Sequence, residues 1–238
     1  KEVKGEENFI PEISFGNGLF NYYSIWVAEE YPLLKPIIRL FPKGDKKLGI
    51  SQLDNAAKNS FYTRTEAQFF LMKILSQENN ISRSFQLSNY LSDLFPNNSI
   101  FHGVNNSLLY RSGRFNECEK ESLIIIENFK NNKYGYKHNL VRQAAFFLGE
   151  IYNSKSEIEL SKKYYNESIE IAKIIDAEKM GYTLHSYFSL GKYAFNENDY
   201  FSAKKYFNKV IKLTKRSEKI NIDSRMFIKK MRYLYISL

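Results

Sequence analysis

The amino-acid sequence predicts an all-α fold in which antiparallel helix pairs stack into a solenoid that ends in a C-terminal capping helix. Apolar residues recur at helical spacing along most of the 238 residues. Similar pairs of amphipathic segments, joined by short polar turns, follow one another along the chain. Such pairs bury their apolar faces by stacking, because no pair buries its own face alone.

The composition is that of a folded protein. Hydrophobic residues make up 43% of the chain, aromatic residues 16% and charged residues 26%, which excludes disorder as the main state. One cysteine excludes an intramolecular disulfide and a cysteine-rich zinc module. No apolar run approaches the roughly 20 residues that a membrane-spanning helix needs. The polar opening, residues 1–9, shows no signal peptide, unless one has already been removed.

The first part of the predicted architecture, residues 1–60, consists of N-terminal helices with a proline-rich insertion and forms a degenerate first repeat. Residues 13–29, which are rich in aromatic side chains, are expected to form one helix, and residues 48–59 another. Three prolines interrupt the helical pattern between them, since proline removes a backbone donor and clashes with the preceding turn. They are Pro32, Pro36 and Pro42.

The second part, residues 61–238, is predicted to be one continuous solenoid of repeats with a capping helix. Successive repeats are expected to begin near Thr65, Ser99, Arg142 and Leu184. We expect Gly149 and Gly191, in the first helices of two repeats, to let the paired helix approach closely. Tyr165 and Phe207, in the second helices, are expected to fill the groove toward the next repeat.

This pattern resembles the tetratricopeptide (TPR) repeat. The first helix of that repeat carries a Trp, Leu, Gly and Tyr signature, and the second carries small, aromatic and small residues before a proline. The best match here consists of Leu190, Gly191, Ala203 and Phe207. The Trp is absent from its position, and a proline closes only one repeat. The resemblance implies a TPR-like right-handed superhelical solenoid that works as a protein–protein interaction scaffold.

Residues 15–130 also resemble large TPR-like helical proteins, both eukaryotic ones of the TTC39/Iml2 type and bacterial ones. The shared run joins a G-x-G-L-F-N motif, a proline segment, a G-D-x-x-x-G-I-x-Q-L motif and an E-A-x-x-x-L motif. These motifs begin at Gly16, Gly44 and Glu66. The resemblance implies a scaffold with a further helical region before this one. For a bacterial chain it implies a periplasmic or cell-envelope location, with the cytoplasm as the alternative.

No catalytic or metal-binding constellation stands out. His102, His138 and His185 are far apart and have no acidic or cysteine partner at ligand spacing. Residues 44–51 have the outer spacing of a P-loop but lack its lysine and a preceding strand, so a turn and a helix start are favoured. Cys118 falls at a small core position of a second helix. We therefore predict that the chain is not an enzyme and holds neither a cofactor nor a metal.

The partner is expected on the concave face, where the family pattern places the outward positions of each first helix. These candidate partner-binding residues are Phe69, Lys73, Tyr110, Phe146, Glu150, His185, Phe188, Lys192 and Phe195. Their aromatic rings would form a ladder against an extended or helical peptide; alternatively, some of them pack against neighbouring helices. The predicted function is a non-enzymatic scaffold that binds a protein or peptide partner within a larger assembly.

Positive charge is concentrated at the C-terminal end. Residues 201–238 carry eleven Lys or Arg and two acids, which accounts for the whole net charge of +9. The candidate basic surface consists of Lys205, Lys209, Lys212, Lys215, Arg216, Lys229, Lys230 and Arg232. One interpretation is the solvated face of a capping helix, whose Phe227, Met231 and Leu234 cover the end of the array. The alternative function is an RNA- or anion-binding protein that uses this surface for nucleic acid, an anionic membrane or an acidic protein.

Overall fold

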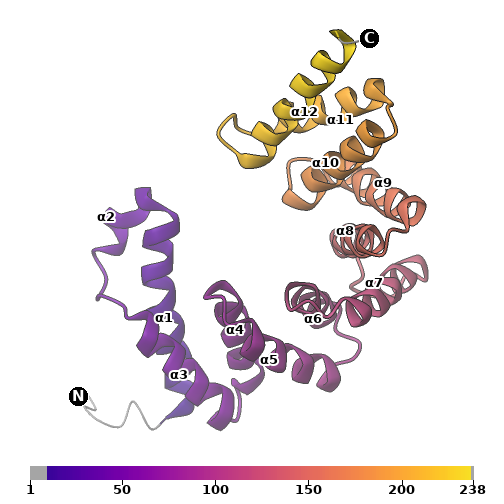
Figure 1. Cartoon of the computed structure of the whole chain (residues 1–238). Coiled ribbons are helices and arrows are strands. Elements are labelled where there is room, and N and C mark those ends of the chain that lie inside the picture. The colour runs from indigo at the N-terminus through magenta and orange to yellow at the C-terminus, as the bar shows by residue number, and fades with distance from the viewer. Residues whose placement is uncertain (1–9, 237–238) are drawn as a thin grey trace. The chain divides into compact units, whose positions relative to one another are not determined.

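The computed structural model describes residues 10–236 of the chain, with side chains up to Arg232. The polar opening, residues 1–9, on which the signal-peptide prediction rests, lies outside the described residues, and so does the side chain of Leu234. Every regular element between residues 10 and 236 is helical, as the sequence predicts. Within each compact unit, successive long helices pack against one another, as Figure 1 shows.

The chain divides into two compact units, one that ends at Ser112 and one that begins at Gly113. Each unit has its own clusters of buried apolar side chains. The helices on either side of residue 60 pack against one another. The boundary predicted at residue 60 therefore falls inside the first unit, and the span predicted as one solenoid, residues 61–238, includes the division after Ser112.

The first unit contains five long helices and a short helical insertion within its described residues. The long helices are α1 (Pro11–Glu30), α3 (Lys46–Asn59), α4 (Arg64–Gln77), α5 (Ile81–Leu94) and α6 (Ser99–Arg111), and the insertion contains η1 (Pro32–Leu34) and α2 (Lys35–Ile38). Fully buried Tyr22, Leu53 and Leu71 form the core between α1, α3 and α4. The helices expected over residues 13–29 and 48–59 are thus confirmed as α1 and α3.

Helices α1 and α3 cross with their backbones in close contact. A Cβ atom added to Gly49 would lie 2.7 Å from the backbone nitrogen of Tyr22 and 2.8 Å from the carbonyl oxygen of Gly18. Just before this crossing, the Asp45 carboxylate caps α3 by accepting hydrogen bonds from the backbone N–H groups of Lys47 and Leu48, at 2.8 and 3.1 Å. The P-loop-like run is therefore a turn and a helix start, as the sequence predicts.

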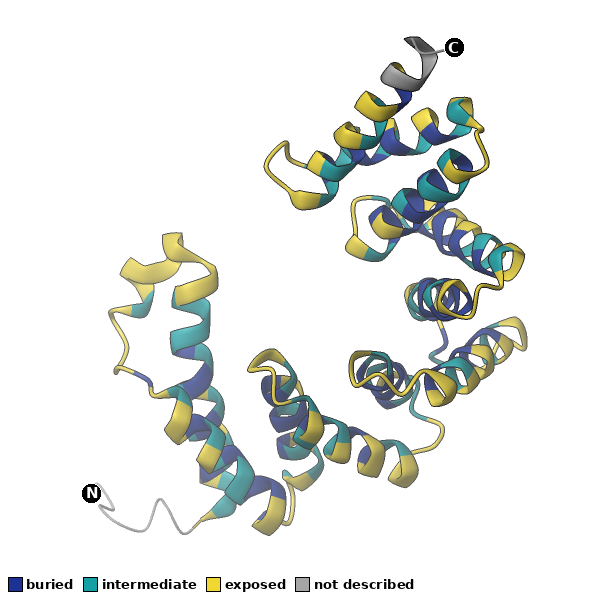
Figure 2. Cartoon of the chain, viewed as in Figure 1, coloured by how far each residue is buried: buried dark blue, intermediate teal, exposed yellow. Residues whose placement is uncertain are grey.

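The second unit consists, in its described part, of six helices. They are α7 (Phe115–Lys130), α8 (His138–Ser154), α9 (Ile158–Ile174), α10 (Gly181–Asn196), α11 (Tyr200–Leu213) and α12 (Lys219–Ile236). The turns inside the α8/α9 and α10/α11 pairs each contain a left-handed residue after the first helix, Ser156 with φ 61° and Asn198 with φ 62°. Figure 2 shows that buried positions lie where these helices face one another.

Glycine and an aromatic ring meet at the crossing of each of these two pairs. A Cβ atom on Gly149 would lie 2.6 Å from the Tyr165 ring, and one on Gly191 would lie 2.8 Å from the Phe207 ring. The expected close approach is confirmed at both positions. The Phe207 ring also stacks on Phe227 of α12, with ring centroids 4.9 Å apart, so α12 covers α11 as the predicted cap does.

Candidate functional site

The structure buries one ring of the predicted aromatic ladder and leaves the other rings half-buried. Phe146 is only 6% exposed, and its ring lies against Tyr165 and Tyr182. Phe188 and Phe195 are half-buried and pack on Phe227 of the capping helix. These rings fill the space between neighbouring helices, where they bury more apolar area than they would on an open face.

The candidate aromatic residues of the first unit also pack against neighbouring side chains. Half-buried Phe69 packs against Phe101, with ring centroids 5.6 Å apart, and joins the cluster around Met72. Tyr110 is also half-buried. The expectation that the Phe146 ring lies on an open face is corrected. Phe146 is a core residue, because both α9 and α10 cover the side of α8 that carries it.

The polar members of the predicted set stay accessible. Lys73 and His185 are exposed, and Glu150 and Lys192 are half-exposed. The ammonium groups of Lys73 and Lys192 lie over the rings of Phe69 and Phe188, each 5.4 Å from the ring centroid. The Glu150 carboxylate accepts a hydrogen bond from the Tyr165 hydroxyl. What remains for a partner on α8 and α10 is therefore a polar surface above an aromatic layer.

A charged residue that sequence reasoning did not select lies beneath this surface. Arg142, at the start of α8, is only 7% exposed. Its guanidinium lies 5.5 Å from the centroid of the Tyr182 ring and donates a 3.3 Å hydrogen bond from Nη1 to Oγ1 of Thr183. Its Nε has no hydrogen-bond partner, and among the described residues no carboxylate forms an ion pair with it. Burial lowers the pKa of Arg142.

The residues beside Arg142 complete a junction between α8 and the first turn of α10. The side-chain amide of Gln143 donates a 3.0 Å hydrogen bond to the Tyr182 hydroxyl, and exposed His185 follows one turn after Tyr182. We call Arg142, Gln143, Tyr182 and His185 the α8/α10 junction. It combines a buried cation, an amide and an imidazole with the positive end of α10 and contains no acid, a combination that suits an anionic group of a ligand.

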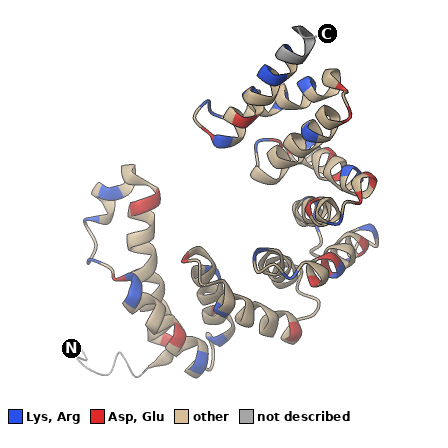
Figure 3. Ribbon diagram, viewed as in Figure 1, with Lys and Arg blue, Asp and Glu red and all other residues tan. Residues whose placement is uncertain are grey.

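The predicted basic surface lies on α11, α12 and the loop between them, where Figure 3 shows Lys and Arg gathered. All eight of its side chains are exposed except that of Lys209, which is partly covered. The Lys209 ammonium lies 2.9 Å from a carboxylate oxygen of Glu178, and this hydrogen bond lowers the pKa of Glu178. The Lys230 ammonium lies over the Phe227 ring, 5.5 Å from its centroid.

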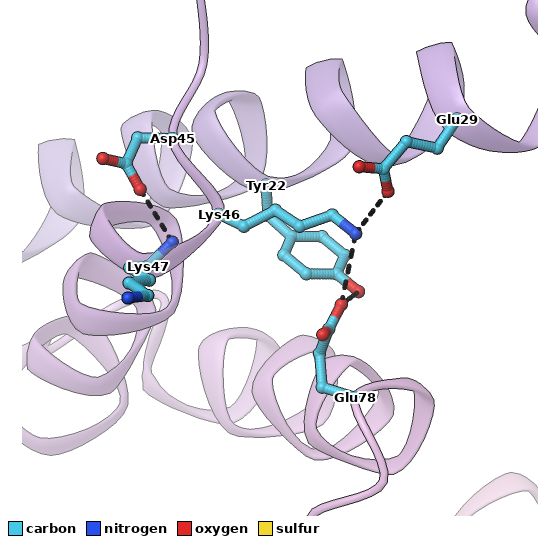
Figure 4. Close-up of polar contacts among 6 residues, drawn as sticks. All are labelled: Tyr22, Glu29, Asp45, Lys46, Lys47 and Glu78. Carbon is cyan, nitrogen blue, oxygen red and sulfur yellow. Dashed lines mark hydrogen bonds and ion pairs between the residues drawn. The ribbon is translucent and has the colours of Figure 1, made fainter.

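A second polar cluster connects α1, α3 and the end of α4 (Figure 4). The Lys46 ammonium lies between two carboxylates, 2.6 Å from Glu29 and 3.4 Å from Glu78. The Tyr22 hydroxyl donates a 2.8 Å hydrogen bond to Glu78, and burial is the main cause that raises the pKa of Tyr22. Because every charged group of this cluster has a partner within the chain, we assign the cluster to the stability of the first unit.

The described residues show no cluster of metal-ligating side chains. Between residues 10 and 232, no group of three or more His, Cys, Asp or Glu side chains is placed to hold a metal ion. Cys118 is buried, and burial raises the pKa of its thiol to about 12, which keeps the nucleophilic thiolate rare at neutral pH. Of the helices in the described residues, none is both long and apolar enough to cross a membrane.

Comparison with known proteins places the TPR pattern in the second unit. Residues 143–174 and 184–216 match the family model of the tetratricopeptide repeat, and these ranges correspond to the α8/α9 and α10/α11 pairs. No curated protein has a matching sequence. The resemblance to the TTC39/Iml2 type stays a prediction.

Solved structures of helical-repeat proteins share the fold. A MamA RS-1 double mutant has a TM-score of 0.56 at 13% identity, and the match covers 83% of this chain and 93% of the MamA chain. MamA 41-end from Desulfovibrio magneticus RS-1 has a TM-score of 0.52 at 14% identity, with coverages of 79% and 94%. BtubC from P. vanneervenii has a TM-score of 0.50 at 13% identity, with coverages of 88% and 75%.

Proposed function

We propose that this chain, a helical-repeat protein whose second unit carries tetratricopeptide repeats, is a non-catalytic scaffold that binds a protein or peptide partner within a larger assembly. The proposal rests first on the repeats themselves, because stacked helix pairs expose long surfaces suited to extended partners. The accessible polar positions of α8 and α10 form the surface that we assign to the partner. Cofactors and metals have no part in this function.

The observation that carries the proposal is the uncompensated charge of Arg142. A buried guanidinium that lacks a carboxylate is costly, because its desolvation is only partly offset by the Tyr182 ring and one hydrogen bond. An acidic side chain or terminal carboxylate of a partner at the α8/α10 junction would offset this positive charge at short range. Gln143 and His185, at the rim of the α8/α10 junction, would then contact the partner beside that group.

A pull-down from extracts of the source cells tests this assignment. The double variant Gln143→Glu/His185→Glu places two negative charges at the rim and should repel an acidic group. Asn166→Glu, on the exposed side of α9, is the matched control for an added negative charge. We expect a protein that is retained by the wild type and by the control, and whose retention falls about tenfold or more with the double variant.

The conditions of the experiment separate the proposal from the alternative function. Binding is measured with and without nuclease treatment of the extract, at low and at high salt. A partner that the double variant retains as well as the wild type contradicts the assignment of the α8/α10 junction. Recovery of nucleic acid at low salt only, abolished by Lys205→Glu/Lys212→Glu, would instead favour the basic surface of α11 and α12, since phosphate contacts are strongly salt-dependent.

A further inference from the structure

The insertion between α1 and α3 exposes an unusual amount of apolar surface. We define the insertion as residues 31–43, which include η1 and α2. Leu33 is 93% exposed and Leu40 is 82% exposed, and Ile37 and Phe41 are both 55% exposed. Figure 2 shows α2 mostly in the colour of exposed residues. Exposed apolar side chains that are gathered in one short segment are typical of an interaction site.

Basic residues alternate with these apolar side chains. Lys35, Arg39 and Lys43 are all exposed, and no acid occurs in residues 31–43. Counting Glu30, one residue outside the insertion, the segment still keeps two net positive charges. The next acid before it, Glu29, is paired with Lys46 of α3. The complementary surface is therefore both apolar and anionic.

The shape of the insertion favours a lipid surface over a protein groove. The exposed side chains follow two short helical turns and the bend after them, and Leu33 and Leu40 project with almost their whole surface. A rigid protein would need a cavity matched to these projecting leucine side chains, whereas the interfacial layer of a membrane adapts to any shape. Aliphatic side chains inserted among headgroups, together with lysine and arginine at the phosphates, are the usual means of interfacial binding.

The backbone of the insertion is also suited to a layer poor in water. Its three prolines have no N–H donor. Other donors are satisfied inside the segment: the N–H groups of Leu34, Arg39, Leu40 and Phe41 bond to the carbonyls of Tyr31, Lys35, Ile37 and Ile38, at 2.8 to 3.1 Å. Internally bonded turns lose fewer hydrogen bonds to water when they enter the interface.

We propose that residues 31–43 dock this chain peripherally on an anionic lipid surface. The side chains of Leu33, Ile37, Leu40 and Phe41 enter the interfacial layer, while Lys35, Arg39 and Lys43 contact lipid phosphates. No helix needs to cross the membrane for this contact. The docking is independent of the proposed partner binding, because it uses residues of the first unit only.

Vesicle flotation tests the proposal with the full chain. Vesicles of phosphatidylcholine alone are compared with vesicles of phosphatidylcholine and phosphatidylserine. We expect the wild type to float with the anionic vesicles, and the bound fraction to fall as salt rises. The variant Leu33→Ser/Leu40→Ser should lower the partition coefficient about 100-fold, roughly tenfold for each leucine that no longer enters the layer. Lys35→Glu/Arg39→Glu should lower it at least about tenfold on anionic vesicles.

Two control variants assign the effect to the insertion. Phe61→Ser/Tyr62→Ser removes two exposed aromatic side chains outside the insertion, at the turn between α3 and α4. This variant should leave flotation unchanged. Lys205→Glu/Lys212→Glu reverses two charges of the basic surface and should also leave flotation unchanged. Because all the substituted side chains are exposed, circular dichroism should report an intact fold for every variant.

Three results would overturn the proposal. The first is a wild type that floats with neither vesicle composition. The second is equal flotation of the wild type and Leu33→Ser/Leu40→Ser, or loss of flotation only with the variant of the basic surface. The third is self-association of the wild type, measured by sedimentation, that the leucine variant abolishes without any vesicle binding, since the insertion would then dock onto a second copy.

Discussion

The α1/α3 pair of the first unit and the α10/α11 pair of the second unit both cross at glycine, yet the two crossings differ in what the glycine contacts. Between α1 and α3, Gly18 and Gly49 bring backbone against backbone. Between α10 and α11, Gly191 instead accommodates the ring of Phe207. The same small residue therefore serves two kinds of helix contact.

The two helix pairs also differ in the segments that connect their helices. The α10/α11 pair is joined by a short turn with Asn198 in the left-handed conformation, which suits a regular repeat. The α1/α3 pair is joined by the insertion of residues 31–43, whose apolar side chains stay exposed. We infer that the second unit uses its connections to continue the stack, while the first unit uses its connection as a surface.

The largest expected loss of stability comes from replacing the Phe207 ring and not from replacing a glycine. Phe207 is fully buried and lies against Gly191, Phe188 and Phe227. Phe207→Ala should lower the free energy of unfolding of the second unit by about 3–5 kcal/mol, because it leaves a cavity between α10, α11 and α12. Urea denaturation followed by circular dichroism measures the change. A loss below about 1 kcal/mol would mean that the ring does not hold these helices together.

The next largest effect is expected where backbone meets backbone. Gly49→Ala would place a Cβ atom 2.7 Å from the Tyr22 backbone nitrogen, and backbone atoms in two packed helices cannot move aside cheaply. We expect the free energy of unfolding of the first unit to fall by about 3 kcal/mol. The fluorescence of Trp26, the one tryptophan of the chain, measures this in urea because Trp26 packs on the core of the first unit.

Gly16→Ala is the matched control for this substitution. Gly16 lies in α1, two residues before Gly18, but a Cβ atom added to Gly16 would meet nothing within 4 Å. The added methyl group should stabilise the helix by about 0.5–1 kcal/mol, since glycine is a poor helix former. Equal destabilisation by Gly16→Ala and Gly49→Ala would contradict the close backbone contact.

A smaller loss is expected for the glycine that faces a ring. Gly191→Ala would place a Cβ atom 2.8 Å from the edge of the Phe207 ring, which can shift by a few tenths of an ångström. The expected loss is about 1–2 kcal/mol, below that of Gly49→Ala, because part of the strain is relieved and alanine favours the helix. Urea denaturation of both variants side by side measures the difference, and the reverse order of the two losses would contradict the contrast between the crossings.

These outcomes depend on contacts that the sequence indicates only in part. The glycine and ring positions of the second unit follow from helical spacing, because both partners of each contact lie within one repeat. The burial of Phe146 does not follow, since spacing gives the face of α8 but not whether α10 covers it. The missing partner of Arg142 and the exposure of Leu33 likewise depend on which distant side chains come near, which a periodic pattern does not contain.

The smallest expected effect concerns the charge pair of Lys209 and Glu178. The hydrogen bond from Lys209 lowers the pKa of Glu178, so the pair contributes stability at pH values above the ordinary pKa of glutamate and loses it as the pH falls through the lowered value. In Lys209→Met the pKa of Glu178 should rise toward its ordinary value. The loss of stability at neutral pH should stay below about 1 kcal/mol, because the pair is partly solvated.

Titration by NMR measures the pKa of Glu178 in the wild type and in the variant. Lys205→Met is the control, because it removes an exposed lysine from the same helix. An unchanged pKa in Lys209→Met would show that Lys209 does not hold Glu178 in its charged form.

One measurement tests the contrast between the two units most directly, because the chain provides one probe for each. Trp26 fluorescence reports the first unit. The accessibility of Cys118 to a thiol reagent reports the second, since this thiol is buried and burial raises its pKa to about 12. Both signals are followed in urea for Gly49→Ala and Gly191→Ala. We predict that Gly49→Ala shifts mainly the Trp26 midpoint and Gly191→Ala mainly the Cys118 midpoint. Equal shifts of both signals by both variants would contradict the account.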